Sequence, residues 1–313
     1  MKNKIAIVQQ PPVFMDLNKT IDKTTKIICE AKKNKADIVI FPEAYVPGYP
    51  AWMWKLRPGT DFEESQLLHR KLVENSVNLS KGGLKKLQKS AKENDITVAI
   101  GLNEIDSVST GTTIYNSFAI IGPDGNILNV HRKLVPTTGE RMIWGRGDAS
   151  GLNVVNTPAG RIGGLICYEN YMPLSRFTLY AQGIDLYLAP TWDFGEPWIS
   201  TLRHIARESG CWVAGCAIPM QGKDIPKEFP FRDKIFPDKD EWLNNGDAVL
   251  IKPSGDIAVG PMNKKKGILY SEYDIKEVID ARRSLDVAGH YSRPDIFELN
   301  VKKSRLKQIN FIS

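Results

Sequence analysis

The chain has 313 residues, of which 42% are hydrophobic and 25% are charged, and its formal net charge is +6. This is the composition of a globular protein with a sizeable core, and no apolar run approaches the ~20 residues that a membrane-spanning helix needs. The basic residues form short runs such as Lys264-Lys265-Lys266 rather than a stripe interleaved with aromatic residues. We therefore expect no nucleic-acid groove and no membrane partner.

The four cysteines do not form the pattern of a disulfide framework, because they are few and scattered. Cys211 and Cys216 lie in one predicted strand and point to opposite faces, so they cannot bridge and would not readily share a metal. Only four consecutive apolar residues precede Gln9, which is too short for a signal-peptide core. We predict a soluble, cytoplasmic protein without a metal site.

Short apolar runs alternate with amphipathic stretches, which predicts an α/β fold in one domain. Some runs, such as 38–41, are apolar throughout, as is typical of a sheet buried on both faces. The predicted strands are 4–9, 37–42, 97–102, 114–121, 161–167, 184–189, 211–217, 248–252 and 267–273. The predicted helices lie within 18–34, 62–75, 84–93, 174–182, 197–209 and 275–283.

Turn and cap signals refine these elements. The sequences Pro123-Asp-Gly125 and Pro253-Ser-Gly255 predict hairpins between antiparallel strands, so the sheets should be mixed. Asp16 is placed to cap the first helix, and Ser175 should lie in the first turn of a later one.

Two segments are predicted to lie outside regular structure. The segment 223–245 is rich in Pro, Lys and Asp, which predicts a long surface loop or lid. The chain that follows Arg293-Pro294 is expected to form an extended arm.

Three segments end in residues that can carry out chemistry. One apolar strand is followed by Pro42 and Glu43, and the segment 129–141 carries Lys133 and Glu140. The run 161–167 ends at the thiol of Cys167. Because strand ends of a layered α/β fold meet at one edge of a sheet, we expect these side chains to converge there.

Together, these groups would make a nucleophilic site. A free thiol has a pKa of about 8.5 and is mostly neutral at pH 7, but the Lys133 ammonium would favour the thiolate and stabilise developing charge. Glu43 would serve as general base and acid, with its pKa raised by burial. Taken singly, such residues are more often a capping or surface carboxylate, a solvated cation and a core cysteine.

The three segments together resemble the signatures of the nitrilase family, in the carbon–nitrogen hydrolase superfamily. The motifs Phe41-Pro-Glu43, His131-Arg-Lys133 and Cys167-Tyr-Glu169 match in order and spacing. The resemblance covers about residues 4–297 and favours the true nitrilase branch. Further matching motifs include Pro47-Gly-Tyr-Pro50, Gly139-Glu-Arg-Met-Ile-Trp-Gly145, Glu169-Asn-Tyr-Met-Pro-Leu174, Ala189-Pro-Thr-Trp-Asp193 and Gly289-His-Tyr-Ser-Arg-Pro294.

This resemblance implies an α-β-β-α sandwich, with a carbon–nitrogen hydrolase (nitrilase) domain over 1–297 and a C-terminal tail over 298–313. It implies no metal or organic cofactor. Relatives pair into dimers and often extend into spirals, so we expect a homodimer and allow a higher spiral oligomer. The tail is shorter than in many filament-forming relatives, which puts long helical assemblies in doubt but not a dimer.

The resemblance also implies roles for individual residues. It assigns the catalytic triad to Glu43, Lys133 and Cys167, and it makes Glu140 a glutamate that hydrogen-bonds the lysine or the substrate. The implied reaction is attack of Cys167 on a nitrile carbon, followed by a thioimidate and an acyl-enzyme, with release of carboxylic acid and ammonia. We interpret His131 as structural.

Aromatic residues near the motifs are predicted to shape the substrate pocket. Trp144 and Tyr171 match pocket positions of the family, whereas Tyr168 stands where many true nitrilases have Trp. The segment 211–220 also departs from the family pattern, which leaves the substrate open among aliphatic, aromatic and arylacetonitriles. The complete predicted set of pocket residues is Tyr49, Trp144, Tyr168, Tyr171 and Trp192.

Other functions remain open at this point. An amidase or an N-carbamoyl amide hydrolase would use the same triad, although Thr138-Gly-Glu-Arg and the motif at 169–174 favour nitriles. Cyanide hydrolysis is also open, since the smallest nitrile fits any such pocket. A non-catalytic subunit would be expected to lack a triad member, and none is missing. A redox-sensing role for Cys167 would be separated from catalysis only by measuring turnover.

Overall fold

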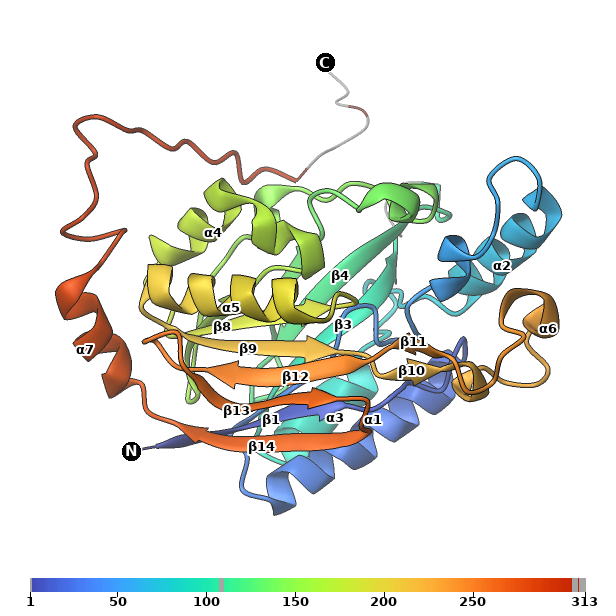
Figure 1. Cartoon of the computed structure of the whole chain (residues 1–313), viewed down its shortest axis with the longest axis horizontal. Helices are drawn as coiled ribbons and strands as arrows, with labels where there is room; N and C mark the ends of the chain where they lie inside the picture. The colour runs from blue at the N-terminus through green and yellow to red at the C-terminus, as the bar shows by residue number, and fades with distance from the viewer. Residues whose placement is uncertain (1, 107–109, 306–308, 310–313) are drawn as a thin grey trace.

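The computed structural model describes residues 2–106, 110–305 and 309 (Figure 1). Two six-stranded sheets dominate this part of the chain. The first sheet has the order β14 (Gly267–Tyr273), β1 (Asn3–Gln9), β2 (Ile38–Ile40), β3 (Thr97–Ile105), β4 (Ile114–Ile121) and β5 (Ile127–Arg132). The second has the order β13 (Ile257–Asn263), β12 (Gly246–Ile251), β9 (Trp212–Ala217), β8 (Leu186–Thr191), β7 (Gly160–Gly164) and β6 (Val155–Thr157).

Helices lie on the outer faces of the two sheets (Figure 1). Apolar side chains of α1 and α3 pack against the first sheet, and those of α4 and α5 pack against the second. The helices are α1 (Leu17–Lys33), α2 (Phe62–Glu74), α3 (Lys85–Glu93), α4 (Pro173–Tyr180), α5 (Glu196–Ser209), α6 (Arg232–Ile235) and α7 (Lys276–Ser284).

Alternation along the strands builds the layers. In β1, Ile5 and Ile7 belong to the cluster between the sheets, whereas Ala6 and Val8 belong to the cluster under the helices. Successive residues of a strand point to opposite faces, so an all-apolar strand is buried on both. The predicted α-β-β-α sandwich is therefore confirmed, and the apolar runs owe their lack of polar residues to this double burial.

The sheets are mixed, as the turns predict. Strand β2 pairs in parallel with β1 and β3, whereas β4 runs antiparallel to both β3 and β5. The turn at Pro123-Asp-Gly125 joins β4 to β5, and the turn at Pro253-Ser-Gly255 joins β12 to β13. The side chain of Asp16 accepts a hydrogen bond from Lys19 N and so caps α1, and Ser175 lies in the first turn of α4, both as predicted.

Two predicted elements need correction. The strand expected over 161–167 ends at Gly164, and Cys167 lies in the short 3-10 helix η4 (Cys167–Tyr171), because side chains from this turn bond its own backbone. The segment 223–245 lies at the surface for most of its length, as predicted, but it is not all loop. It contains α6 and β11 (Trp242–Asn244), which pairs with β10 (Met220–Gln221), and it buries Phe229 and Phe236 in the core.

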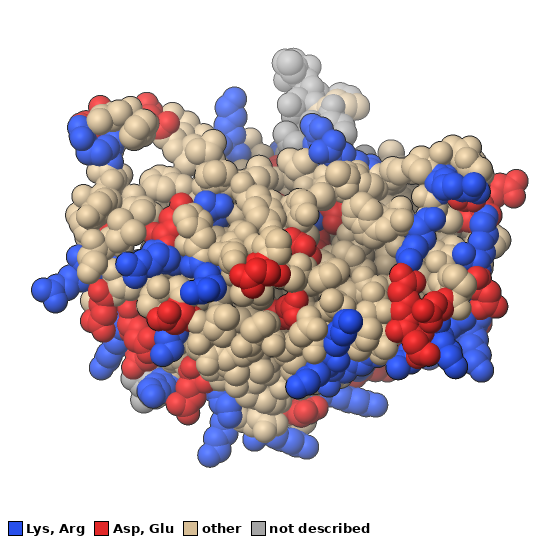
Figure 2. Space-filling model, in the orientation of Figure 1, with Lys and Arg blue, Asp and Glu red and all other residues tan. Residues whose placement is uncertain are grey.

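The surface agrees with the mild net charge. Figure 2 shows Lys and Arg side chains interspersed with Asp and Glu side chains on the face in view. Within residues 2–106, 110–305 and 309, no helix is long and apolar enough to cross a membrane. After α7 the chain makes turns at 287–291 and 294–296, and the described residues 297–305 then lie outside helices and strands as the predicted extended arm (Figure 1).

Candidate active site

Glu43 and Lys133 meet at the end of the first sheet. Glu43 follows β2 and Lys133 follows β5, and the lysine Nζ lies 2.8 Å from Glu43 Oε1. Strand β3 lies very close to the backbone that leads to Glu43. A Cβ added to Gly101 of β3 would lie only 2.1 Å from the carbonyl oxygen of Pro42. Only glycine permits this approach, which brings the Glu43 backbone against the sheet.

Glu140 completes a buried cluster around the lysine. Its Oε2 lies 2.7 Å from Lys133 Nζ and accepts a hydrogen bond from Thr137 N, also at 2.7 Å. Its Oε1 accepts a hydrogen bond from Tyr49 Oη at 2.8 Å. Glu43, Lys133 and Glu140 are each at most 1% exposed. The short 3-10 helix η2 (Thr138–Met142) therefore presents Glu140 to the lysine in a fixed orientation.

The two carboxylates and the ammonium perturb one another. Burial raises the pKa of Glu43 to about 7, although Lys133 and the side-chain amide of Asn116 act to lower it. Burial lowers the pKa of Lys133, but Glu43, Cys167 and Glu140 outweigh that cost and hold it above its usual value. The lysine is therefore charged at neutral pH, while Glu43 can exchange a proton there.

One oxygen of Glu43 is uncommitted. Its Oε1 accepts from Lys133 and, at 2.7 Å, from Asn116 Nδ2. Its Oε2 is buried and has no hydrogen-bond partner among the described residues. Buried carboxylate oxygens are normally paired, so this atom is available to a group that arrives or ionises during a reaction.

Cys167 comes to this cluster from the second sheet, so the strand ends do not meet at the edge of one sheet as expected. The cysteine has φ +52°, a left-handed conformation that is uncommon for a residue with a side chain. Asn170 Nδ2 holds the turn by donating to Cys167 O at 2.7 Å. The site therefore lies between the two halves of the sandwich.

The thiol is neutral in the resting site. Burial raises the pKa of Cys167, and the negative charge of Glu43 raises it further. Lys133 acts in the expected direction by lowering the pKa of the thiol, and so does a side-chain hydrogen bond from Thr191, but burial outweighs both. The thiolate therefore needs a base that removes the proton at the time of attack.

The predicted pocket aromatics fall into a buried group and an exposed group. The Tyr49 ring stacks on Trp192 with centroids 4.2 Å apart and packs edge-on to Trp144 at 5.5 Å. Tyr168 and Tyr171 are 48% and 41% exposed and pack edge-on to each other at 5.1 Å. The first group supports Glu140 through the Tyr49 hydroxyl. The second lies within η4, the cysteine turn (Cys167–Tyr171).

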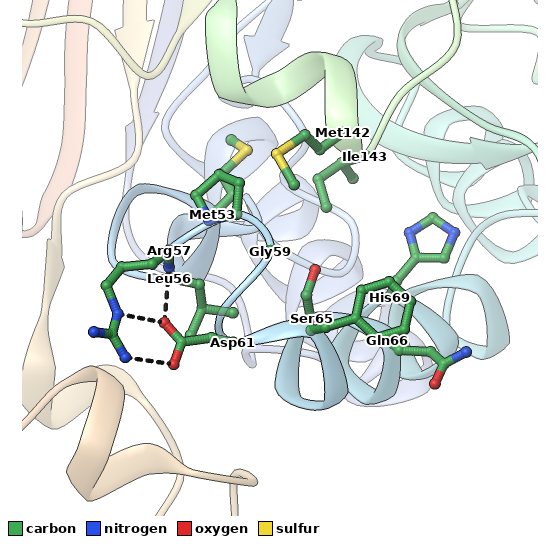
Figure 3. Close-up of a pocket in the computed structure, with 12 residues that line it drawn as sticks. Met53, Leu56, Arg57, Gly59, Asp61, Ser65, Gln66, His69, Met142 and Ile143 are labelled. Atoms are coloured by element: carbon green, nitrogen blue, oxygen red, sulfur yellow. Dashed lines mark hydrogen bonds and ion pairs between the residues drawn. The ribbon is translucent and has the colours of Figure 1, made fainter.

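A cavity of about 280 Å³ borders the turn that carries Glu140 (Figure 3). Met142 and Ile143 form one part of its lining, and Met53 and Leu56 form another. Arg57 and Asp61, which form an ion pair, line it at the left of Figure 3. Glu43, Lys133 and Cys167 are not among the described residues that line it, so this cavity is separate from the cluster.

Sequence comparison identifies the family. The Carbon-nitrogen hydrolase family model matches residues 4–283. The chain belongs to the carbon–nitrogen hydrolase family. It is 38% identical to "Nitrilase 2" of Arabidopsis thaliana over 99% of this chain and 91% of that protein. It is 36% identical to the "Aliphatic nitrilase" of Sinorhizobium fredii (strain HH103), over 96% of each chain.

The fold agrees with that of other carbon–nitrogen hydrolases. The chain superposes on the NitFhit protein of C. elegans with a TM-score of 0.71 and 21% identity, covering 98% of this chain and 69% of that one. The resemblance to nitrilases in the motifs is thus confirmed at the level of family and fold. The family match ends at 283, so the predicted boundary at 297 and the tail over 298–313 stay predictions, and 306–308 and 310–313 lie outside the described residues.

Sequence reasoning missed several residues of this carbon–nitrogen hydrolase site. Asn116 lies in the middle of an apolar strand, and nothing in the local pattern signals that it donates to Glu43. Thr191 and Glu169 do lie in motifs that match the family, but their partners are distant in sequence. In the described part of the chain, no group of three or more His, Cys, Asp or Glu side chains could hold a metal ion.

Proposed function

We propose that this carbon–nitrogen hydrolase is a nitrilase that converts an organic nitrile and two molecules of water into a carboxylic acid and ammonia. The observation that carries the proposal is the buried Glu43–Lys133–Glu140 cluster beside Cys167. The nitrilase names of relatives with 36% and 38% identity, matched along almost the whole chain, favour nitriles as the substrate class.

In the proposed first step, Cys167 attacks the nitrile carbon. Glu43 takes the thiol proton, using its uncommitted Oε2, and delivers a proton to the nitrile nitrogen. The product is a covalent thioimidate. Lys133 remains charged and stabilises the negative charge that develops on nitrogen, while Glu140 and its Tyr49 hydrogen bond keep the ammonium in place.

Hydrolysis then releases the two products in turn. Glu43 activates a water molecule that adds to the thioimidate carbon, and the tetrahedral intermediate expels ammonia to leave a thioester. A second water molecule, activated in the same way, releases the carboxylic acid and restores the thiol. If the carbon–sulfur bond breaks before ammonia leaves, the amide appears as a side product.

Ammonia release tests this proposal. We expect ammonia from at least one class in a panel of aliphatic, aromatic and benzylic nitriles, with little from the matching amides and none from Cys167→Ala. Release from amides alone would make the protein an amidase. No release from any substrate by the folded protein would contradict the proposal for these compounds.

We also propose that the protein works as a homo-oligomer, at least a dimer. Exposed apolar residues cluster around the cysteine turn and α4, where Tyr168 is 48%, Tyr171 41% and Leu174 67% exposed. Such a cluster is typical of an interface. Light scattering should give a dimer mass or more, and Leu174→Asp should lower it; a monomer for the natural chain would contradict the proposal.

The location in the cell is likewise proposed to be cytoplasmic. The support is that Cys29, Cys167, Cys211 and Cys216 are all free thiols, as is usual in a reducing compartment. Cell fractionation tests it, and recovery in the membrane or secreted fraction would contradict it.

A further inference from the structure

Glu169 is a buried carboxylate that the proposed chemical steps do not use. Its Oε1 accepts hydrogen bonds from Leu134 N at 2.6 Å and His131 Nε2 at 3.1 Å. Its Oε2 accepts from Ile166 N at 2.8 Å and from the same histidine nitrogen at 3.0 Å. The carboxylate is 1% exposed, so all of these bonds form away from solvent.

The backbone partners of this carboxylate lie next to the two key side chains. Leu134 directly follows Lys133, and Ile166 directly precedes Cys167. Lys133 extends from the first sheet, whereas Cys167 follows a strand of the second. Glu169 therefore bridges the two halves of the sandwich beside Lys133 and Cys167, whose charges act on each other.

The site is built to hold a charged carboxylate. His131 Nδ1 is buried and has no partner among the described residues, whereas Nε2 faces Glu169 and donates to it. Burial raises the pKa of Glu169, but His131 and the amides of Leu134 and Ile166 more than offset this and lower it overall. An ionised carboxylate can accept all of these bonds at once, and a neutral amide cannot.

We propose that Glu169 is a positioning residue that sets the separation between the Lys133 ammonium and the Cys167 sulfur. It also braces the cysteine turn, where φ +52° would otherwise relax. The consequence for nitrile hydrolysis rests on the proposed function, but the consequence for thiol reactivity does not. Misplacement of a reacting group by about 1 Å can cost roughly 100-fold in rate, so a lost bridge should be visible in kinetics.

The test variant is Glu169→Gln. The amide group would face one of the two backbone N–H groups, donor against donor, so one half of the bridge is lost while the side-chain volume is kept. We expect kcat for a nitrile to fall about 100-fold with KM within about 3-fold. We also expect the rate of Cys167 alkylation by iodoacetamide to fall about 10-fold and its pH dependence to shift, because Lys133 no longer faces the sulfur correctly.

Glu104→Gln is the matched control. Glu104 is also buried at 3% exposure, and it accepts from Arg132 and from Ser117 Oγ at 2.6 Å, but these bonds do not touch the cysteine turn. We expect this variant to lose thermal stability as Glu169→Gln does, yet to keep kcat and the alkylation rate within about 3-fold of the natural protein.

The outcomes separate a positioning role from a purely structural one. Natural kcat and alkylation rate in folded Glu169→Gln, or equal kinetic losses in both variants, would overturn the proposal. If Glu169→Gln does not fold, Glu169→Asp keeps the charge but is one methylene too short to reach both Leu134 N and Ile166 N, and unchanged alkylation in that folded variant would overturn the proposal too. Alkylation, followed at Cys167 by mass spectrometry, needs no nitrile turnover and so distinguishes this failure from failure of the proposed function.

Discussion

Arg132 and Lys133 are consecutive residues at the end of β5, yet they enter two buried ion clusters of different character. Arg132 pairs with Glu104, and Lys133 pairs with Glu43 and Glu140. Neighbouring residues of a strand point to opposite sides, which is why adjacent cations reach separate partners.

The arginine cluster is satisfied throughout. Both oxygens of Glu104 bind the Arg132 guanidinium, and one of them also accepts from Ser117. The guanidinium carbon lies 3.8 Å from the centroid of the Tyr115 ring. Both oxygens of Glu104 therefore have a partner, as a structural ion pair requires, and the charge of the buried Asp106 also favours the charged guanidinium.

The lysine cluster is left unbalanced. Two carboxylates face one ammonium, Glu43 Oε2 has no partner among the described residues, and the pKa of Glu43 is raised to about 7. Perturbed and under-satisfied groups of this kind are characteristic of functional sites. The comparison teaches that incomplete pairing, rather than burial of charge as such, separates the chemical cluster from the structural one.

The largest expected effects come from replacing Lys133 and Arg132, one at a time, with Met. We expect Lys133→Met to lower kcat/KM by about 1,000-fold, because the charge that stabilises the nitrile nitrogen is lost. We expect Arg132→Met to lower the free energy of unfolding by about 3–5 kcal/mol, because it leaves Glu104 as an unpaired buried charge. Ammonia release and urea unfolding measure the two effects. Equal activity losses in the folded variants would contradict the distinction.

The pH dependence tests the raised pKa of Glu43. As a base, Glu43 must be ionised, so kcat/KM should fall tenfold per pH unit below about 7. The folded protein holds this proton at a pH where the unfolded chain, with a pKa near 4.5, has released it. Stability should therefore fall, by at most a few kcal/mol, as pH rises from about 4.5 to about 7.

Glu43→Gln isolates that contribution. The variant cannot titrate at this position, so the difference in unfolding free energy between it and the natural protein should change only across this pH window. Its activity should be lost at every pH. A difference that is flat from pH 4 to pH 8 would show that the pKa of Glu43 is not raised.

A smaller effect is expected from removing the Tyr49 hydroxyl, which donates a hydrogen bond to Glu140. Tyr49→Phe removes a hydrogen bond to a charged group, worth about 1.5–3 kcal/mol, and should lower kcat/KM about tenfold by loosening the glutamate behind Lys133. Tyr45→Phe is the control, because the buried Tyr45 hydroxyl has no partner among the described residues. That variant should keep its activity and be as stable as the natural protein or more so. Equal activity in the two variants would show that the Tyr49 hydroxyl does not contribute to catalysis.

The sequence predicted the long strands that are buried along their length, and it missed β13, which is not. Strand β4 is buried at every position and has its predicted bounds, whereas β13 lies at a sheet edge with mostly exposed or half-exposed residues and has no continuous apolar run. A strand that is buried on two faces needs a continuous apolar run, which can be recognised in the sequence. A strand with a solvated face has no such run and is hard to recognise. In the surface segment 223–245 the polar composition hides a few buried aromatic residues, so the pattern did not indicate α6 and β11.

The sequence was enough to predict which main residues form the site, but not how the fold brings them together. Glu43, Lys133 and Cys167 stand where apolar runs end, so the pattern and the family resemblance both point to them. That Cys167 comes from the opposite sheet, and that Asn116 and Glu169 complete the hydrogen bonds, depends on contacts between residues far apart in sequence. Local pattern carries no information on such contacts.

The smallest predicted effect concerns Thr191, at the end of β8. Its Oγ1 accepts a hydrogen bond from Asp193 N at 2.7 Å, which leaves the hydroxyl proton free for Cys167. The hydrogen bond between the two side chains lowers the pKa of the thiol and so partly offsets burial. Thr191→Val should therefore raise the pKa of Cys167 further and reduce kcat/KM about 2–10-fold, as expected for one neutral hydrogen bond.

Thr97→Val provides the matched control for this small effect. Thr97 is buried in the first sheet, and its Oγ1 has no hydrogen-bond partner among the described residues. The same change of hydroxyl to methyl there should leave both kcat/KM and the pH dependence of Cys167 alkylation as in the natural protein. If Thr191→Val also leaves that pH dependence unchanged, the hydroxyl does not act on the sulfur, and the thiolate is stabilised at the moment of attack by Lys133 without it.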